Sequence, residues 1–167
     1  SELTTPGAME LQNLFQEMKI AGVNVAAMEV SSIALDQYRT AGTRFKVGVF
    51  TNLTQDHLDY HGDFENYWKA KQKFFCDYDL DTAVINRDDP RSEDLLKLSG
   101  ARRFLTFAIH HMQADFKVLS VNFDRKSTRA QIQTPEGEVE LVTSLIGVHN
   151  LYNAMGVMHT NYGLGIS

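Results

Sequence analysis

Residues 45–52, FKVGVFTN, decide the fold class of this chain of 167 residues. The run is short, mostly apolar and bounded by polar residues, which is typical of a strand buried on both faces of a parallel sheet. A second run of the same kind, VNVAAMEV, occupies residues 23–30. Helical patterns and a further short strand at 83–85 alternate with these runs. The sequence therefore predicts an α/β fold with a mostly parallel sheet flanked by helices.

Three helices are expected in the first hundred residues. The first has apolar residues at helical spacing, with Thr5 as its predicted N-cap, Pro6 as its first helical residue and Gly22 at its end. The second runs over about 64–78, and the third lies between residues 90 and 100. These helices supply the crossover connections that parallel strands require.

The later part of the chain carries strands of another kind. Apolar and polar residues alternate over 119–124, 129–133 and 138–141, and a Pro-Glu-Gly turn separates the last two runs. Such half-exposed strands predict an antiparallel β extension of the sheet. A final helix is expected to begin near His149.

Length and composition are those of a single soluble domain, which we expect to cover residues 1–167. The sequence is 43% hydrophobic and 22% charged, unlike a disordered chain. Its net charge of -5 argues against a nucleic-acid partner or an anionic membrane surface. The single Cys76 excludes an internal disulfide or a cysteine zinc site, and no signal peptide or membrane-spanning segment is visible. These observations predict a cytoplasmic protein.

Polar side chains follow the first two predicted strands. Glu29 and Ser31 come at the end of the first, and Asn52 ends the second. The loop after Asn52 carries four candidate ligands, which are Asp56, His57, Asp59 and His61. Ligands of open α/β sheets bind beyond the carboxyl ends of the strands, so these groups can converge on one crevice that suits Mg²⁺ or Mn²⁺. The alternative is a solvated histidine loop whose aspartates cap turns.

The predicted helix over 64–78 has one anomaly, because Lys71 falls on its apolar stripe. The other members of the stripe are Phe64, Tyr67, Trp68, Phe75 and Tyr78. Lys69 and Lys73 project from the opposite side, which a solvated helix face explains. Lys71 either reaches water past the aromatic rings or is desolvated. A desolvated lysine has a lowered pKa, and its neutral amine can react with carbon dioxide to give an anionic carbamate that binds metal.

Two further polar groups stand at predicted helix starts. The Thr4–Thr5 pair precedes the first helix, where capping is a sufficient explanation, although such hydroxyls also suit an anionic substrate. Asn153 lies close after His149, where an asparagine can cap the helix or present its amide to a base edge. Spacing alone leaves both alternatives open.

Taken together, these segments resemble the central domain of the Mur ligase family. The strings that carry the resemblance are LTTPGAMELQ, AMEVSSIALDQYR, VFTNLTQDHLDYHGDFENYWKAK, INRDDP and GVHNLYNAMG, in that order. They cover essentially the whole chain. TNLTQDHLDYHGD is the most specific of them, because it distinguishes the members that add the third amino acid to the muramoyl peptide from folylpolyglutamate and cyanophycin synthetase relatives.

The resemblance assigns roles to particular residues. Glu29 and His57 align with magnesium ligands of the family, and Lys71 aligns with the lysine that is carried as a carbamate. The positions that align with UDP-muramoyl-dipeptide contacts are Thr4, Thr5, Ser31, Gln37 and Arg39. Asn52 and Asn153 fall where the family approaches the adenine of ATP. Ile33 stands where many members have His, and Leu3 where some have Asn.

The family reaction transfers the γ-phosphoryl group of ATP to the terminal carboxylate of UDP-N-acetylmuramoyl-L-alanyl-D-glutamate. The resulting acyl phosphate is attacked by the amine of the incoming amino acid, and Mg²⁺ assists. The phosphate-binding loop of the family has the pattern G-x-x-x-x-G-K-[S/T], which does not occur in this sequence. We therefore expect a truncated central domain, inactive alone, that lacks the upstream loop and the N- and C-terminal domains.

Three alternatives remain at the level of sequence. A related ligase of the folylpolyglutamate type would use the same central fold on another substrate. A non-catalytic binding module would lack the phosphate-binding loop in its gene. A metal-dependent phosphohydrolase would be built on His57 and His61 and would need neither ATP nor that loop.

Overall fold

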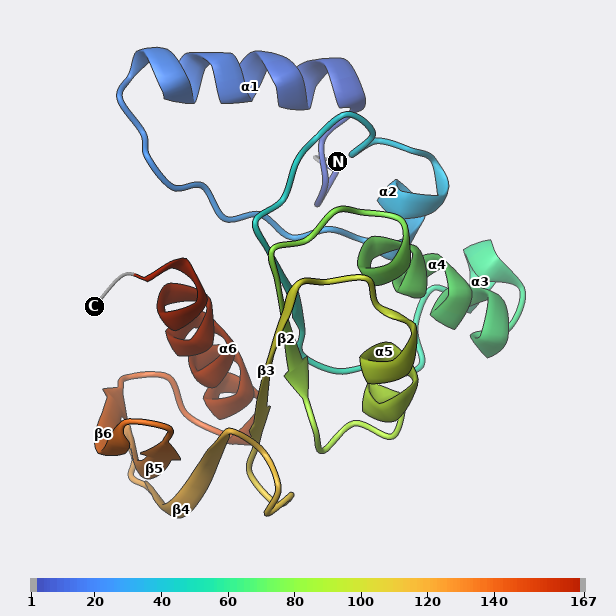
Figure 1. The fold of residues 1–167 in the computed structure, drawn as a ribbon. Coiled ribbons are helices and arrows are strands. Elements are labelled where there is room, and N and C mark those ends of the chain that lie inside the picture. Colours follow the sequence, from blue (N-terminus) through green and yellow to red (C-terminus); the bar gives the residue numbers. More distant parts are fainter. Residues whose placement is uncertain (1–2, 166–167) are drawn as a thin grey trace. The chain divides into compact units, whose positions relative to one another are not determined.

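The computed structural model describes residues 3–165 (Figure 1). These residues form two compact units. Unit 1 holds the described residues up to Arg44 together with Gln55–Tyr78, and unit 2 holds Phe45–Thr54 and the residues from Asp79 onward. Within residues 3–165 no helix is long and apolar enough to cross a membrane. The single domain expected over 1–167 stays a prediction.

Unit 2 contains a six-stranded sheet whose spatial order follows the chain. The strands are β1 (Val47–Phe50), β2 (Thr82–Asn86), β3 (Arg103–Ala108), β4 (Phe116–Phe123), β5 (Thr128–Thr134) and β6 (Gly137–Thr143). β1 to β4 pair in parallel, and β4 to β6 pair antiparallel. The predicted α/β class with an antiparallel extension is confirmed.

Two helices cover the parallel part of this sheet from opposite sides (Figure 1). They are α5 (Ser92–Leu98) and α6 (Val148–Leu164), both expected from the sequence. Every residue of β2 is buried between them, as the apolar pattern predicted. α6 approaches β1 closely at Gly156, where a Cβ atom would lie 3.3 Å from Val49. A larger side chain at Gly156 would therefore push the helix away from the sheet.

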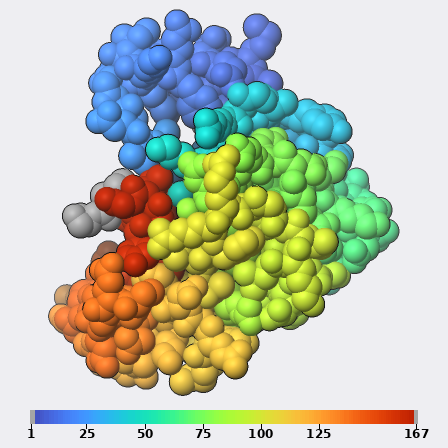
Figure 2. All heavy atoms as spheres, in the orientation of Figure 1, coloured from blue at the N-terminus to red at the C-terminus, as the bar shows by residue number. Residues whose placement is uncertain are grey.

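The antiparallel extension is less evenly buried than the parallel part. Ala130 and Ile132 of β5 are buried in the core, as their alternation predicted. A bulge between Val118 and Ser120 shifts the register of β4, so Leu119 leaves the regular alternation and is exposed. Figure 2 shows these strands, in amber to orange, as a continuous surface beside the red atoms of α6.

Unit 1 begins with α1 (Ala8–Ile20), and Gly22 follows its end with a φ of 78°. A positive φ favours glycine, so the predicted end of this helix is confirmed. The predicted N-cap is wrong, because the N-cap is Gly7 and no side chain caps the helix. Thr5 instead lies buried, two residues outside, and bonds another segment.

The strand predicted over residues 23–30 is wrong as well. The segment is not part of the sheet, and Val23 and Val25 are 46% and 54% exposed. A strand exists only where a neighbour completes its hydrogen bonds, and an apolar run cannot show whether that neighbour is present. The sequence predicted that Glu29 ends a strand, but Glu29 lies in a segment that is not part of the sheet.

The remaining helices of unit 1 are α2 (Ser32–Asp36), α3 (Leu58–His61) and α4 (Phe64–Cys76). α4 matches its prediction and buries an aromatic side that packs on Ala34 and Leu35 of α2. The two short helices were not predicted. Ser31 was a visible signal for α2, because its hydroxyl accepts a hydrogen bond from Ala34 N as an N-cap does.

Candidate substrate and metal site

Thr5 joins the start of the chain to the segment before α2. Its buried hydroxyl donates to the carbonyl of Glu29 at 3.0 Å and accepts a hydrogen bond from Ser31 N at 3.0 Å. Thr4 lies beside it and is exposed. The hydroxyl of Thr5 thus fixes the backbone on which Glu29 and Ser31 stand, which replaces the capping role expected from the sequence.

A tight turn after α2 brings Gln37 and Arg39 together. Between them Tyr38 has a φ of 54°, a left-handed conformation that costs a non-glycine residue roughly 1–2 kcal/mol. The turn lets Gln37 Oε1 accept from Arg39 Nε at 2.9 Å and also from Arg39 Nη2. Arg39 Nη1 donates to the carbonyl of Thr5 at 3.2 Å. The structure therefore connects Thr5, Ser31, Gln37 and Arg39, four of the five predicted substrate residues.

His57 and Lys71 meet at one aromatic ring. Lys71 Nζ lies 5.5 Å from the centroid of the Tyr67 ring, and the ring of His57 lies 6.0 Å from the same centroid, edge-on. Tyr67 is buried, and desolvation by that burial raises the pKa of its hydroxyl. Lys71 is half-buried on the stripe of α4, as its position in the sequence predicted. An ammonium over a ring face gains cation–π attraction.

The backbone at His57 is strained in the same way as at Tyr38, with a φ of 53°. The His57 side chain is 40% exposed, and its Nε2 lies 3.6 Å from a carboxylate oxygen of Asp56. Glu29 is exposed as well. Glu29 and His57 both reach solvent, so both side chains are open to an approaching metal ion. The carboxylate is the kind of ligand that Mg²⁺ prefers, whereas an imidazole is more typical of transition metals. Among residues 3–165 no group of three or more His, Cys, Asp and Glu side chains is arranged to hold a metal ion.

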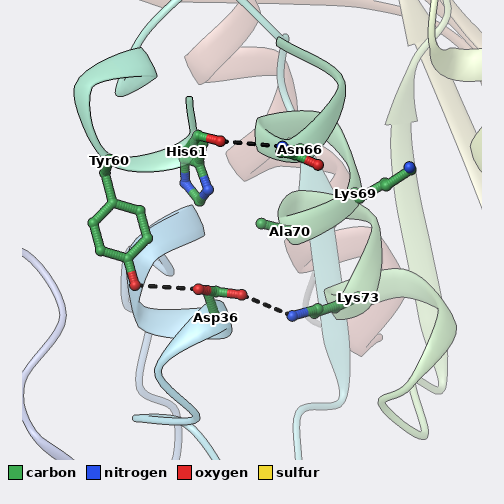
Figure 3. A pocket seen from close by; sticks show the side chains of 7 residues that line it. All are labelled: Asp36, Tyr60, His61, Asn66, Lys69, Ala70 and Lys73. Carbon is green, nitrogen blue, oxygen red and sulfur yellow. Dashed lines mark hydrogen bonds and ion pairs between the residues drawn. The ribbon is translucent and has the colours of Figure 1, made fainter. Parts of the chain in front are cut away.

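A hollow of about 380 Å³ lies between α2, α3 and α4 (Figure 3). Asp36 lines it between Tyr60 and Lys73, where Oδ1 accepts from Lys73 Nζ at 2.9 Å and Oδ2 accepts from the Tyr60 hydroxyl at 3.1 Å. The hydrogen bond from Lys73 lowers the pKa of Asp36, and the same bond raises the pKa of Lys73. Lys73 is thus a half-buried ion-pair partner, whereas the sequence predicted a solvated lysine.

His61 lies at the wall of this hollow. Its Nε2 is 3.0 Å from Ser32 Oγ, and its carbonyl accepts from Asn66 Nδ2 at 3.2 Å. Desolvation lowers the pKa of the imidazole. Since these contacts join α3 to α2 and α4, His61 has a packing role, and the phosphohydrolase alternative gains no support from it.

Unit 2 has its own polar end, at the carboxyl ends of its parallel strands. Asn86 Nδ2 donates to Thr51 O at 2.6 Å, and Asp89 accepts from Leu53 N at 2.7 Å. These bonds tie the loop around the half-buried Asn52 to the end of β2. Asn153 is exposed on α6, one turn before the glycine that touches β1.

Asp88 ties a further loop to this end. It accepts from the backbone N–H groups of Ile109, His110 and His111 and from the Tyr152 hydroxyl. Burial acts to raise the pKa of Asp88, but these hydrogen bonds outweigh it and lower the pKa below its usual value. The resemblance gave the string INRDDP no physical role, whereas in the structure its polar side chains bond the loop at 51–53, the loop at 109–111 and α6.

The α/β fold with its antiparallel extension is that of a Mur ligase middle domain. The family model described as Mur ligase middle domain matches residues 1–160, and the chain belongs to this family.

Individual relatives are more specific. The chain is 39% identical over 164 residues to a UDP-N-acetylmuramoyl-L-alanyl-D-glutamate--2,6-diaminopimelate ligase of Trichormus variabilis, covering 98% of this chain and 33% of the relative. It is 40% identical over 167 residues to the ligase of the same name from Halalkalibacterium halodurans, of which it covers 34%. The chain therefore spans about a third of the length of the curated relatives it matches.

Solved structures agree with this assignment. A structure of a UDP-N-acetylmuramoyl-L-alanyl-D-glutamate--2,6-diaminopimelate ligase superposes with a TM-score of 0.91 at 28% identity, covering 98% of this chain and 34% of that chain. A MurF ligase from Thermotoga maritima, solved in complex with ADP, has a TM-score of 0.63 at 17% identity over 83% of this chain and 31% of that one. The second likeness shows the shared fold.

Proposed function

We propose that this chain is the middle part of an ATP-dependent ligase that adds an amino acid to UDP-N-acetylmuramoyl-L-alanyl-D-glutamate in peptidoglycan synthesis. The observation that carries the proposal is the grouping of the proposed substrate and metal residues in one compact unit. Thr5, Ser31, Gln37 and Arg39 are connected by hydrogen bonds, and His57 and Lys71 share the ring of Tyr67. The names of the relatives support 2,6-diaminopimelate as the amino acid.

Arg39 is the proposed contact for the anionic substrate. A guanidinium carries five N–H groups, and the bonds to Gln37 and Thr5 use three of them. The other two can pair with a carboxylate or phosphate oxygen. Thr4 and Ser31 would add hydroxyl contacts, while Thr5 keeps the loop in place with its buried hydroxyl.

Glu29 and His57 would hold Mg²⁺, and Lys71 would join them as a carbamate. The ammonium of Lys71 first loses one proton. The neutral amine then attacks the carbon of carbon dioxide, an N–C bond forms as one C=O π bond opens, and a second proton is released, so a cation becomes an anion. The bound ion would neutralise charge on the phosphate oxygens while the substrate carboxylate takes up the γ-phosphoryl group. The amine of the amino acid then displaces phosphate from the acyl phosphate.

ATP would meet residues of unit 2. We propose that Asn52 and Asn153 approach the adenine, because Asn52 lies two residues after β1 and Asn153 lies on the helix that packs against β1. The pattern G-x-x-x-x-G-K-[S/T] does not occur in residues 1–167. The proposal therefore takes that loop, and the N- and C-terminal domains, from residues outside this chain, in a cytoplasmic enzyme.

Lys71 offers the sharpest test of this function in the ligase that contains these residues. We expect Lys71→Ala and Lys71→Arg to lower kcat by about 100-fold or more, since each removes charge stabilisation at the reacting phosphate. Lys69→Ala is the matched control, because Lys69 is exposed two residues away on the same helix and should keep its activity. A carbamate also predicts that activity falls in buffer freed of carbon dioxide and returns with bicarbonate. Full activity in Lys71→Ala would overturn the assignment.

A further inference from the structure

A continuous line of hydrogen bonds runs from α4 to the proposed substrate loop. Lys73 donates to Asp36, and the Tyr60 hydroxyl donates to the same carboxylate. Gln37 Nε2 donates to the Tyr60 oxygen at 3.3 Å, and Gln37 Oε1 accepts from Arg39. Figure 3 shows the first part of this line, in which Tyr60 and Lys73 point at Asp36 from opposite sides. All five residues belong to unit 1.

The chemistry of the groups gives the line one direction. An ammonium can only donate and a carboxylate can only accept, so the Tyr60 hydrogen points at Asp36. The lone pairs of the Tyr60 oxygen are then left for the amide N–H of Gln37. With its NH₂ group turned toward Tyr60, Gln37 presents its carbonyl oxygen to Arg39. The guanidinium of Arg39 can also only donate, so the groups at both ends of the line require the same orientation of the Gln37 amide.

The line contributes little to stability. Asp36 and Lys73 are 42% and 35% exposed at the side chain, and exposed ion pairs typically stabilise a protein only slightly. The Tyr38 turn between Gln37 and Arg39 is itself strained by its positive φ. Gln37 and Arg39 flank this strained turn, and the weak polar line holds their side chains. The arrangement therefore orients these two side chains rather than stabilising the fold.

We propose that Asp36, Tyr60 and Lys73 are positioning residues that orient Gln37 and Arg39 for the anionic end of the UDP-muramoyl substrate. Their role rests on the proposed function, because it needs Arg39 to contact that substrate. Lys73 lies on α4 two residues after Lys71. The line therefore also couples the helix that carries the proposed carbamate to the loop that binds the substrate.

The kinetic test removes one hydroxyl from the middle of the line in the complete ligase. We expect Tyr60→Phe to raise KM for the UDP-muramoyl-dipeptide about five- to tenfold, which corresponds to one lost hydrogen bond. The kcat and the KM for ATP should stay within about twofold of wild type. Tyr78→Phe is the matched control, because Tyr78 also loses a hydroxyl bond, to Thr40 at 2.7 Å, outside the line.

A rescue pair separates charge from shape. Lys73→Met keeps the length of the side chain but loses the ion pair, so it should raise the same KM as Tyr60→Phe does. Lys73→Arg keeps a donor for Asp36 and should stay near wild type. The proposal would be overturned if Tyr60→Phe, Lys73→Met and Tyr78→Phe had the same KM for the UDP-muramoyl-dipeptide. It would also be overturned if Lys73→Arg raised this KM as much as Lys73→Met.

A second readout does not depend on ligase activity. In the 167-residue chain, the NMR signal of the Arg39 Nε–H, assigned by its loss in Arg39→Lys, reports the bond to Gln37. This signal should shift in Tyr60→Phe and Lys73→Met and stay in place in Tyr78→Phe. An unchanged signal contradicts the positioning line itself. A shifted signal in a ligase that ignores the UDP-muramoyl substrate contradicts the proposed function instead.

Discussion

Different forces stabilise the two compact units of this chain, each taken by itself. Unit 2 is built on a sheet whose strand β2 is buried throughout, and its core consists of apolar side chains. Unit 1 also buries the aromatic side of α4, but segments far apart in its sequence are joined by hydrogen bonds in which Thr5 and Asp36 take part. The comparison teaches that apolar burial supplies the stable frame here, while polar contacts set the geometry of the proposed site.

The largest effect should come from the core of unit 2. Phe107 is fully buried, so Phe107→Ala should lower the free energy of unfolding by about 3–5 kcal/mol. Phe123 is 40% exposed on the same sheet, and Phe123→Ala should cost less than about 1.5 kcal/mol. Urea unfolding of the 167-residue chain measures both. Similar losses for the two variants would contradict a core centred on Phe107.

A pH effect of intermediate size should come from His159. This side chain is fully buried, with its ring 3.8 Å from the Phe116 centroid and its Nδ1 bonded to Met155 O. Desolvation lowers its pKa to about 4, although the bond to Met155 and the charge of Asp115 act in the other direction. The folded chain therefore keeps His159 neutral while the unfolded chain protonates it near its usual pKa of 6.5.

Because the unfolded state binds the extra proton, stability should be lost as the pH falls from about 6.5 to 4, by up to about 3 kcal/mol. Urea unfolding at several pH values measures this slope. His159→Leu should flatten it, whereas His149→Leu, at an exposed position, should not. A slope that survives in His159→Leu would assign the acid sensitivity to other groups.

Thr5 should have a smaller effect, which tests the polar side of the comparison. Thr5→Val removes the hydroxyl but keeps the shape, and leaves Glu29 O and Ser31 N without this partner. The expected loss is about 1–3 kcal/mol in the free energy of unfolding. Thr5→Ser should retain most of the stability, and Thr4→Val should be nearly neutral because Thr4 is exposed. No loss in Thr5→Val would show that the segment before α2 is held by something else.

The smallest effect on stability should come from the ion pair in unit 1. Asp36→Asn and Lys73→Met should each lower the free energy of unfolding by less than about 1 kcal/mol, because both side chains are partly exposed. Chemical denaturation measures this loss in the free energy of unfolding. It is repeated with about 0.5 M salt, because salt at this concentration screens exposed ion pairs. A loss comparable to that of Phe107→Ala would remove the distinction between the two units.

Much of unit 2 could be predicted because its elements follow local patterns. The run FKVGVFTN gave β1, and the alternation through Ala130 and Ile132 gave β5. The bulge at Leu119 was missed, since one extra residue in a strand leaves no mark in the alternation until the partner strand is known. Burial periodicity is enough for a core whose neighbours all lie in the same sheet.

Unit 1 was predicted less well because its contacts are made by single polar side chains. The apolar run over 23–30 has no strand partner, and the Thr5 hydroxyl bonds Ser31 instead of a helix end. Asp36 and Tyr60 gave no signal, because only the fold brings residues 24 positions apart into contact. Lys71 was found because it interrupts an apolar stripe, and the roles of Glu29, His57 and Lys71 stay predictions.

Product formation by the complete ligase is the most direct test of the central claim. The enzyme containing these residues would be incubated with ATP, Mg²⁺, UDP-N-acetylmuramoyl-L-alanyl-D-glutamate and 2,6-diaminopimelate, and the products followed by mass spectrometry. We expect a UDP-muramoyl-tripeptide formed together with equal amounts of ADP, and a rate of product formation lowered by about 100-fold or more in Lys71→Ala. No tripeptide, or ADP release that ignores the UDP-muramoyl substrate, would contradict it.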